Sequence, residues 1–205
     1  MAPLINKGLR RLAGIWLFSS LYLTIATDSR AQSPVGISLI PKVSIPPKDW
    51  SVIGVRLNLI TGWHQDMFGL DLGVVGNFVN YRTVGTQIAG VFNSNWDAYI
   101  VGAQIAGITN INQKSSYIYG AQIAGLANAN KEGHLAGLQL SMFNSSPAMS
   151  IVGIQAGIIN QADHVIGLQI GLINSAKRLT GIQIGLLNFD EDSWLPFFPL
   201  LNIGL

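Results

Sequence analysis

Residues 167–188 read GLQIGLINSAKRLTGIQIGLLN, in which the octapeptide GLQIGLIN returns after a short spacer as GIQIGLLN. The glycine, glutamine and asparagine positions are kept, whereas the aliphatic residues between them vary. Such self-similarity indicates that the chain is built from one structural unit used many times. The fold should therefore follow from what this unit forms and how its copies pack.

The same unit can be followed back along the chain to residue 54. Its first glycine recurs at intervals of 14 to 18 residues, at Gly54, Gly69, Gly85, Gly102, Gly120, Gly137, Gly153, Gly167 and Gly181. In the last seven units a glutamine follows two positions later, at Gln87, Gln104, Gln122, Gln139, Gln155, Gln169 and Gln183. An asparagine follows each glutamine after five or six positions, at Asn93, Asn110, Asn128, Asn144, Asn160, Asn174 and Asn188.

Each unit alternates with a period of two residues, which is typical of a β-strand. In the unit at 167, Leu168 and Ile170 fall on one face, and Gln169 and Gly171 fall on the other. A helix is disfavoured because glycine recurs inside every unit. The spacers between units are rich in Asn, Ser, Asp, Gly and Pro and predict turns, and the asparagines are expected to end strands there. The sequence therefore predicts an all-β fold, closed by a last strand over residues 198–205.

Both faces of each strand are largely apolar, so both faces need to be covered. Two architectures can use such strands. We expect an up-and-down antiparallel β-barrel of about ten strands, because strands of roughly ten residues match the ~9–11 that span a bilayer and closure pairs every backbone group. The alternative is a β-solenoid, in which each unit is one coil and equal residues stack. Stacked amides favour the solenoid, but units of 14–18 residues leave little room for a coil with two faces and two turns.

The glutamines are predicted to form a structural row of amides, since each side chain brings both donors and acceptors. The first two units carry charges in the glutamine position, Arg56 and Asp71. Because buried charges are usually paired, these two residues are expected to form an internal ion pair that fixes the register and closes the row. A charged lumen element is the alternative interpretation of this pair.

The chain divides into three predicted parts. Residues 1–31 are predicted to be a signal peptide, with a basic start, an apolar stretch from Leu12 to Ala26 and cleavage after Ala31. An uncleaved membrane anchor is the alternative. Residues 32–50 form a Pro-rich lead-in or edge segment, and residues 51–205 form the β-repeat domain.

Charge is scarce outside the first part. Only 11% of the residues are charged, against ~25% in a typical soluble domain, so most of the surface is expected to meet something other than bulk water. Residues 1–31 hold four basic residues and one acidic residue, a charge of +3, which turns the formal +2 of the chain into −1 for the remainder. Outer-membrane lipid is therefore the expected partner. Nucleic acid is not, because the electrostatic attraction is missing.

The sequence predicts no catalytic, cofactor-binding or metal site. The chain contains no cysteine and only three scattered histidines, His64, His134 and His164, so a metal has few ligands available. No carboxylate pair or nucleophile motif is indicated by spacing. We therefore predict a protein that is not an enzyme. The sequence identifies no small-molecule substrate, and whether the chain has a protein partner is unknown.

The units GTQIAGVFN, GAQIAGITN, GAQIAGLAN and GLQIGLIN resemble a family of secreted bacterial surface repeat-containing proteins first named from leptospiral surface proteins. The resemblance covers about residues 85 to 205, with a degenerate extension back to 51. It implies export and residence at the outer membrane or cell surface of a Gram-negative-type bacterium, and it implies no biochemical activity. Some members are lipoproteins, but this chain lacks the cysteine that the lipid modification requires.

From these observations we predict an exported, non-enzymatic β-repeat protein. Its expected form is a small outer-membrane β-barrel with a structural or passive role in the envelope. The alternative is a secreted or surface-exposed β-repeat module for binding or adhesion.

Overall fold

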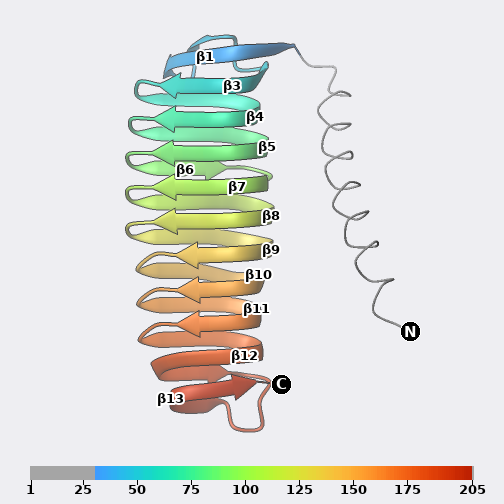
Figure 1. The fold of residues 1–205 in the computed structure, drawn as a ribbon, viewed down its shortest axis with the longest axis vertical. Helices are drawn as coiled ribbons and strands as arrows, with labels where there is room; N and C mark the ends of the chain where they lie inside the picture. The colour runs from blue at the N-terminus through green and yellow to red at the C-terminus, as the bar shows by residue number, and fades with distance from the viewer. Residues whose placement is uncertain (1–30, 205) are drawn as a thin grey trace, which may run out of the picture. The chain divides into compact units, whose positions relative to one another are not determined.

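The computed structural model describes residues 31–204, in which the chain winds into a β-solenoid (Figure 1). The predicted signal peptide lies outside the described residues apart from Ala31. The strands are β1 (Gln32–Ile40), β2 (Val43–Ile45), β3 (Ser51–Asn58), β4 (Thr61–Gly73), β5 (Gly76–Ala89), β6 (Phe92–Asn95), β7 (Tyr99–Ala106), β8 (Thr109–Ala124), β9 (Ala127–Leu140), β10 (Phe143–Ala156), β11 (Ile159–Ile170), β12 (Ile173–Asp190) and β13 (Phe197–Gly204).

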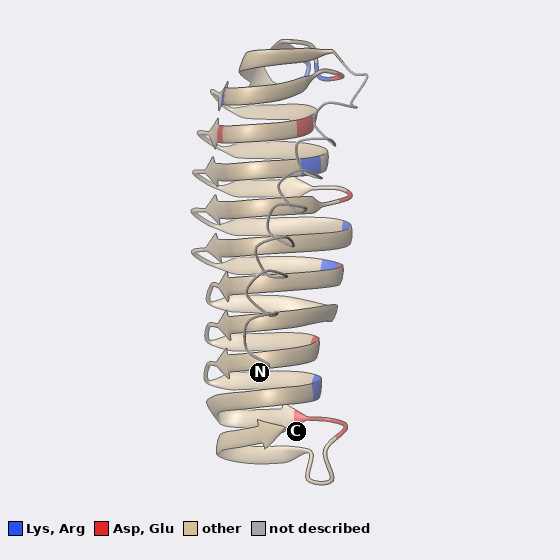
Figure 2. Ribbon diagram, turned by 45° about the vertical axis from the view of Figure 1, so that its right-hand side comes forward, with Lys and Arg blue, Asp and Glu red and all other residues tan. Residues whose placement is uncertain are grey.

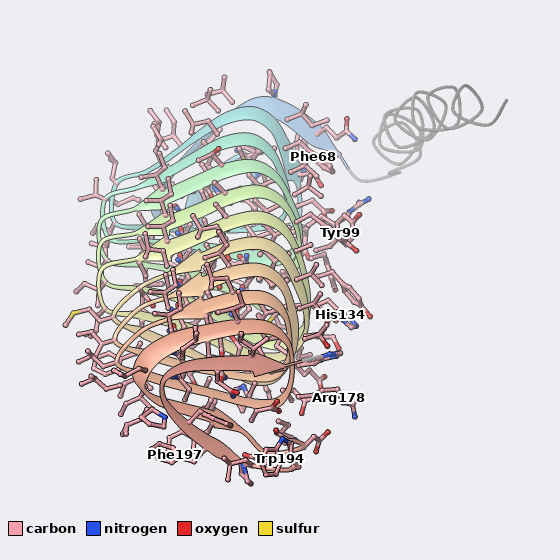
Figure 3. All side chains as sticks on the ribbon, turned by 60° about the horizontal axis from the view of Figure 1, so that its bottom comes forward. Phe68, Tyr99, His134, Arg178, Trp194 and Phe197 are labelled. Atoms are coloured by element: carbon pink, nitrogen blue, oxygen red, sulfur yellow. The ribbon has the colours of Figure 1, made fainter. Side chains whose placement is uncertain are left out.

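One coil can be followed through β8. The strand begins with Asn110 and Asn112 pointing inward, bends at residues 113–116, and returns with Ile118 and Gln122 pointing inward. Gly125 and Leu126 then turn the chain into β9. Each coil is thus a flattened ring with two sides, one bend inside a strand and one two-residue turn (Figure 3).

Consecutive coils pair in parallel and in register, so equal positions of the repeat lie beside one another. Between β8 and β9, for example, Gly120 pairs with Gly137 and Gln122 pairs with Gln139. Among the described strands, antiparallel pairing is found only at the ends, between β1 and β2 and between β12 and β13. The predicted all-β class is confirmed, the antiparallel barrel is wrong, and the solenoid fits.

Two features make a coil possible with so few residues. The polar spacers do not reverse the chain as hairpin turns would, because the strand usually continues through them as a bend. The other reversal takes only two residues, such as Gly125 and Leu126. The prediction that asparagines end strands is also wrong, since Asn110 and Asn128 lie inside strands and are fully buried.

The first glycine of each unit is explained by the contact between coils. Gly120 has a φ of 137°, a region that residues with a Cβ atom rarely adopt. A Cβ atom at this position would also overlap the carbonyl oxygen of Gly102 in the preceding coil. The other first glycines share the positive φ and the same kind of close approach. This position therefore accepts only glycine.

The interior of the solenoid is largely polar. One buried row is aliphatic and consists of Ile100, Ile118, Leu135, Ile151, Val165 and Leu179. Met149, Ala162 and Ala176 pack beside this row. The glutamines and asparagines of the repeat provide most of the buried polar groups, and each of them is at least 99% buried. Packing and hydrogen bonding between coils must therefore hold the fold together jointly.

Both ends of the stack are covered by short strands. The Pro-rich segment over residues 32–50 provides β1, which pairs in parallel with β3, and β2, which folds back onto β1. At the other end β13 pairs antiparallel with β12, and Asn202 Nδ2 donates a hydrogen bond of 3.0 Å to Gln183 Oε1. The last amide of the glutamine row thus has a partner.

Candidate functional site

The seven glutamines singled out from the sequence lie in one buried row along the solenoid. From Gln104 onward, each Nε2 donates to the Oε1 of the glutamine in the preceding coil, at distances between 2.6 and 3.2 Å. Gln87, the first of the row, donates instead to Asp71 Oδ2 at 3.2 Å. The row is therefore a continuous ladder whose donors all point toward the N-terminal end.

A second ladder, which the sequence reasoning missed, is formed by the asparagines. From Asn77 to Asn174, each Nδ2 donates to the Oδ1 of the asparagine in the following coil, at 2.8 to 3.0 Å. The same Nδ2 atoms reach backbone carbonyls, as Asn110 does at Ile123 O, 2.8 Å away. Donors of this ladder point toward the C-terminal end, so the dipoles of the two ladders oppose each other. The fixed spacing of Asn after Gln in the sequence was the signal that could have revealed the asparagine ladder.

Arg56 and Asp71 lie in the line of the glutamine row, in register with each other and with Gln87. Arg56 Nε donates to Asp71 Oδ1 at 2.7 Å, and Nη2 contacts Oδ2. Asp71 also accepts from Asn58 Nδ2 at 2.9 Å. Both charged side chains are fully buried. The carboxylate thus accepts the last donor of the ladder, and the guanidinium balances its charge.

His64 is buried beside this ion pair. Its Nδ1 lies 3.4 Å from the Trp50 carbonyl oxygen, and its Nε2 lies 3.5 Å from Ser38 Oγ. Burial, and to a smaller extent the nearby charge of Arg56, lower the pKa of His64 to about 4. The ring is therefore neutral at neutral pH, which suits a position next to a guanidinium.

The polar groups of the interior offer little to a ligand. The glutamines and asparagines bond mainly to one another and to backbone carbonyls, and solvent does not reach them. Across residues 31–204 there is no group of three or more His, Cys, Asp or Glu side chains that could hold a metal ion. In that range no helix is long and apolar enough to cross a membrane.

One edge of the solenoid is aliphatic along its length, and we call it the aliphatic edge. It is formed by the residue after the turn glycine or serine of each coil, namely Val91, Ile108, Leu126, Met142, Ile158, Leu172 and Leu186. All except Val91 are exposed, and Leu172 and Leu186 expose more than half of their surface. Backbone groups here are paired between coils, for example Leu126 N with Ile108 O at 2.9 Å.

The apolar surface continues from this edge onto the adjoining sides of the coil. Val152, Ile154, Ile166 and Ile182 point outward from the side that carries the glutamines and are 39 to 45% exposed. On the other side, Phe143 and Leu187 are similarly exposed. Apolar side chains therefore continue from the aliphatic edge onto both flat sides, although on the asparagine side exposed polar residues such as Ser145 and Gln161 lie among them.

Charges lie at the opposite edge, at the bends, and we call this the charged edge (Figure 2). Between Thr83 and Phe189 the chain carries seven Asp, Glu, Lys or Arg residues, all of them at the bends: Asp97, Lys114, Lys131, Glu132, Asp163, Lys177 and Arg178. Lys177 Nζ lies 2.8 Å from Asp163 Oδ1, and this contact raises the pKa of the lysine. The cross-section of the coil is thus strongly amphipathic.

Aromatic rings lie beside the charged edge. Tyr99, Tyr117 and His134 occupy equal positions in three consecutive coils, and Figure 3 shows Tyr99, His134 and Arg178 following one another along this side. The ring centroids of Tyr117 and His134 are 5.7 Å apart, and those of Tyr99 and Tyr119 are 5.9 Å apart. We call Tyr99, Tyr117, Tyr119 and His134 the aromatic patch.

Comparisons of the chain with protein-family models, with curated proteins and with solved structures find no match.

Proposed function

We propose that this chain is an exported, non-enzymatic envelope protein whose solenoid binds lipid through its apolar exterior. The observation that carries the proposal is the aliphatic edge with the apolar surface that continues from it onto the glutamine side, while all charges of residues 83–189 lie at the opposite edge. Exposed apolar patches beyond a few hundred Å² mark interaction sites. The expected role is structural, at the outer membrane or cell surface.

Hydrocarbon is a suitable partner for this surface because the backbone beneath it is already satisfied. A segment that enters lipid must pair its N–H and C=O groups internally. Parallel pairing between coils does so along the solenoid, and the turns are included, as Ile108 N bonds Val91 O at 2.9 Å. The glutamines and asparagines, which hydrocarbon would not tolerate, are enclosed.

A module that binds another protein is the second candidate, and the flat side bearing Ile154, Ile166 and Ile182 favours it. A single rigid partner would cover this side and leave the aliphatic edge and the far side exposed. Acyl chains can cover all three. We therefore favour lipid over a protein partner.

The proposal is tested by flotation of the full chain with phosphatidylcholine vesicles in high salt, which screens charge effects. We expect the wild-type protein to float. The double variant Ile166→Glu/Leu172→Glu should lose at least about tenfold in partitioning, because a charge is costly in hydrocarbon.

The matched control is Gln113→Glu/Gln161→Glu, which adds the same charge at two exposed polar positions outside the aliphatic edge. It should float like the wild type. Equal flotation of the two double variants would contradict the proposal, since the apolar exterior would then not be the part that binds. Urea unfolding of each variant verifies that it remains folded.

A further inference from the structure

We propose that the solenoid lies with its long axis in the plane of a phospholipid bilayer, with the aliphatic edge among the acyl chains and the charged edge in water. This inference rests on the proposed lipid binding and adds the orientation and the depth of the bound protein. It assigns the aliphatic edge as the membrane-contacting surface and the aromatic patch as its boundary.

The first support is the distance between the two edges. In β8 the stretch from Tyr117 to Ala124 pairs with β7 without a register shift and leads from the charged edge to the aliphatic edge. Eight strand residues span roughly 25 Å. One leaflet contributes roughly 15 Å to a hydrocarbon core of about 30 Å. The aliphatic edge can thus enter one leaflet while Lys114 and Lys131 stay in water.

The second support is the place of the aromatic patch. Tyr99, Tyr117 and Tyr119 are exposed between the apolar side and the charged edge. Tyrosine has an apolar body and a polar tip and is enriched where hydrocarbon meets water. In the proposed orientation these rings lie at the level of the lipid headgroups.

The third support comes from the ends of the stack. Within residues 31–204, no strand pairs with the outer edges of β2 and β13, so no strand of this range satisfies the outward-pointing backbone groups there. Standing on end, the solenoid would bring the whole of one such edge into hydrocarbon, where unpaired backbone groups are costly. Lying flat, it presents the paired turns of the aliphatic edge instead.

Single-cysteine labelling tests this orientation, since the chain contains no native cysteine. A polarity-sensitive fluorophore is attached in the full chain at Leu126→Cys or Leu172→Cys on the aliphatic edge, and at Gln113→Cys or Lys131→Cys on the charged edge. Phosphatidylcholine vesicles are then added, and the emission of each labelled protein is compared with its emission in buffer.

The orientation predicts a several-fold rise and a blue shift in emission at Leu126→Cys and Leu172→Cys, and no change at the charged edge. Labelled proteins that float but respond at the charged edge as strongly as at the aliphatic edge overturn the orientation and leave the lipid-binding function intact. Labelled and unlabelled proteins that both fail to float overturn the function and the orientation together.

Discussion

At the scale of single residues, this chain reverses the usual distribution of polarity. Gln122 is fully buried, whereas Leu126, four positions later, is exposed. Burying an amide is tolerable only if its hydrogen bonds are replaced. Gln122 meets this condition because its Nε2 donates to Gln104 and its Oε1 accepts from Gln139 and Asn130. The repetition in the sequence therefore serves the interior, where each coil provides the partners of the next.

The start of the glutamine row can be rebuilt by mutation, because Arg56 and Asp71 occupy glutamine positions. Either single change, Arg56→Gln or Asp71→Gln, leaves a buried charge without its partner and should lower the free energy of unfolding by about 3–5 kcal/mol. The double variant extends the amide ladder by two rungs. We expect its loss to be less than half that of either single variant, as measured by urea unfolding.

The exposed ion pair of Lys177 and Asp163 serves as the control for this comparison of single and double variants. Replacing both by glutamine should change stability additively, because exposed ion pairs contribute little. Additive losses at Arg56 and Asp71 as well would show that the two residues do not continue the row.

At the scale of the element, the coil depends on its first glycine. Gly120→Ala adds a Cβ atom that overlaps the carbonyl oxygen of Gly102, in a backbone region that alanine avoids. We expect a loss of more than about 3 kcal/mol in the free energy of unfolding, which is large for a single methyl group. Ala121→Ser, at the next and outward-facing position, should cost less than about 1 kcal/mol. Similar values for the two variants in thermal or urea unfolding would contradict the close approach of the coils.

The strands and their inward glutamines follow from the sequence, but the direction of strand pairing does not. Alternation with a period of two residues is the same in parallel and antiparallel sheets, so the unit at 167 fits either. Spacers such as residues 175–178 contain turn-forming residues, and these can bend a strand as well as reverse it. What decides between parallel and antiparallel pairing is the set of contacts between coils, and the sequence of a single unit does not reveal these contacts.

The asparagine row was missed for a related reason. Asparagine is common at strand ends, and this local preference predicts a turn at Asn128. In the solenoid, stacking gives Asn128 Nδ2 a partner in the next coil, Asn144 Oδ1, and another in the Leu140 carbonyl oxygen. These two hydrogen bonds outweigh the local preference and keep the residue inside a strand.

At the scale of the whole molecule, residues 32–205 form one compact unit by their internal contacts. In-register stacking lines up equal positions, so one aliphatic residue per coil becomes an aliphatic edge, and a few charged residues per bend become a charged edge. In a stacked repeat each coil contacts mainly its neighbours. The surface that we propose for lipid binding therefore exists only if the coils stack in register.

Distances along the aliphatic edge test this claim most directly. Spin labels are placed in pairs of cysteines in the full chain, at Ile108 with Ile158 and at Ile108 with Leu186, which lie three and five coils apart. With about 4.8 Å between neighbouring strands, the backbone separations should be roughly 14 Å and 24 Å. We predict that pulsed electron paramagnetic resonance finds distances that grow with the number of coils. Distances that do not increase from the first pair to the second would contradict the stacked coils and the continuous edge built on them.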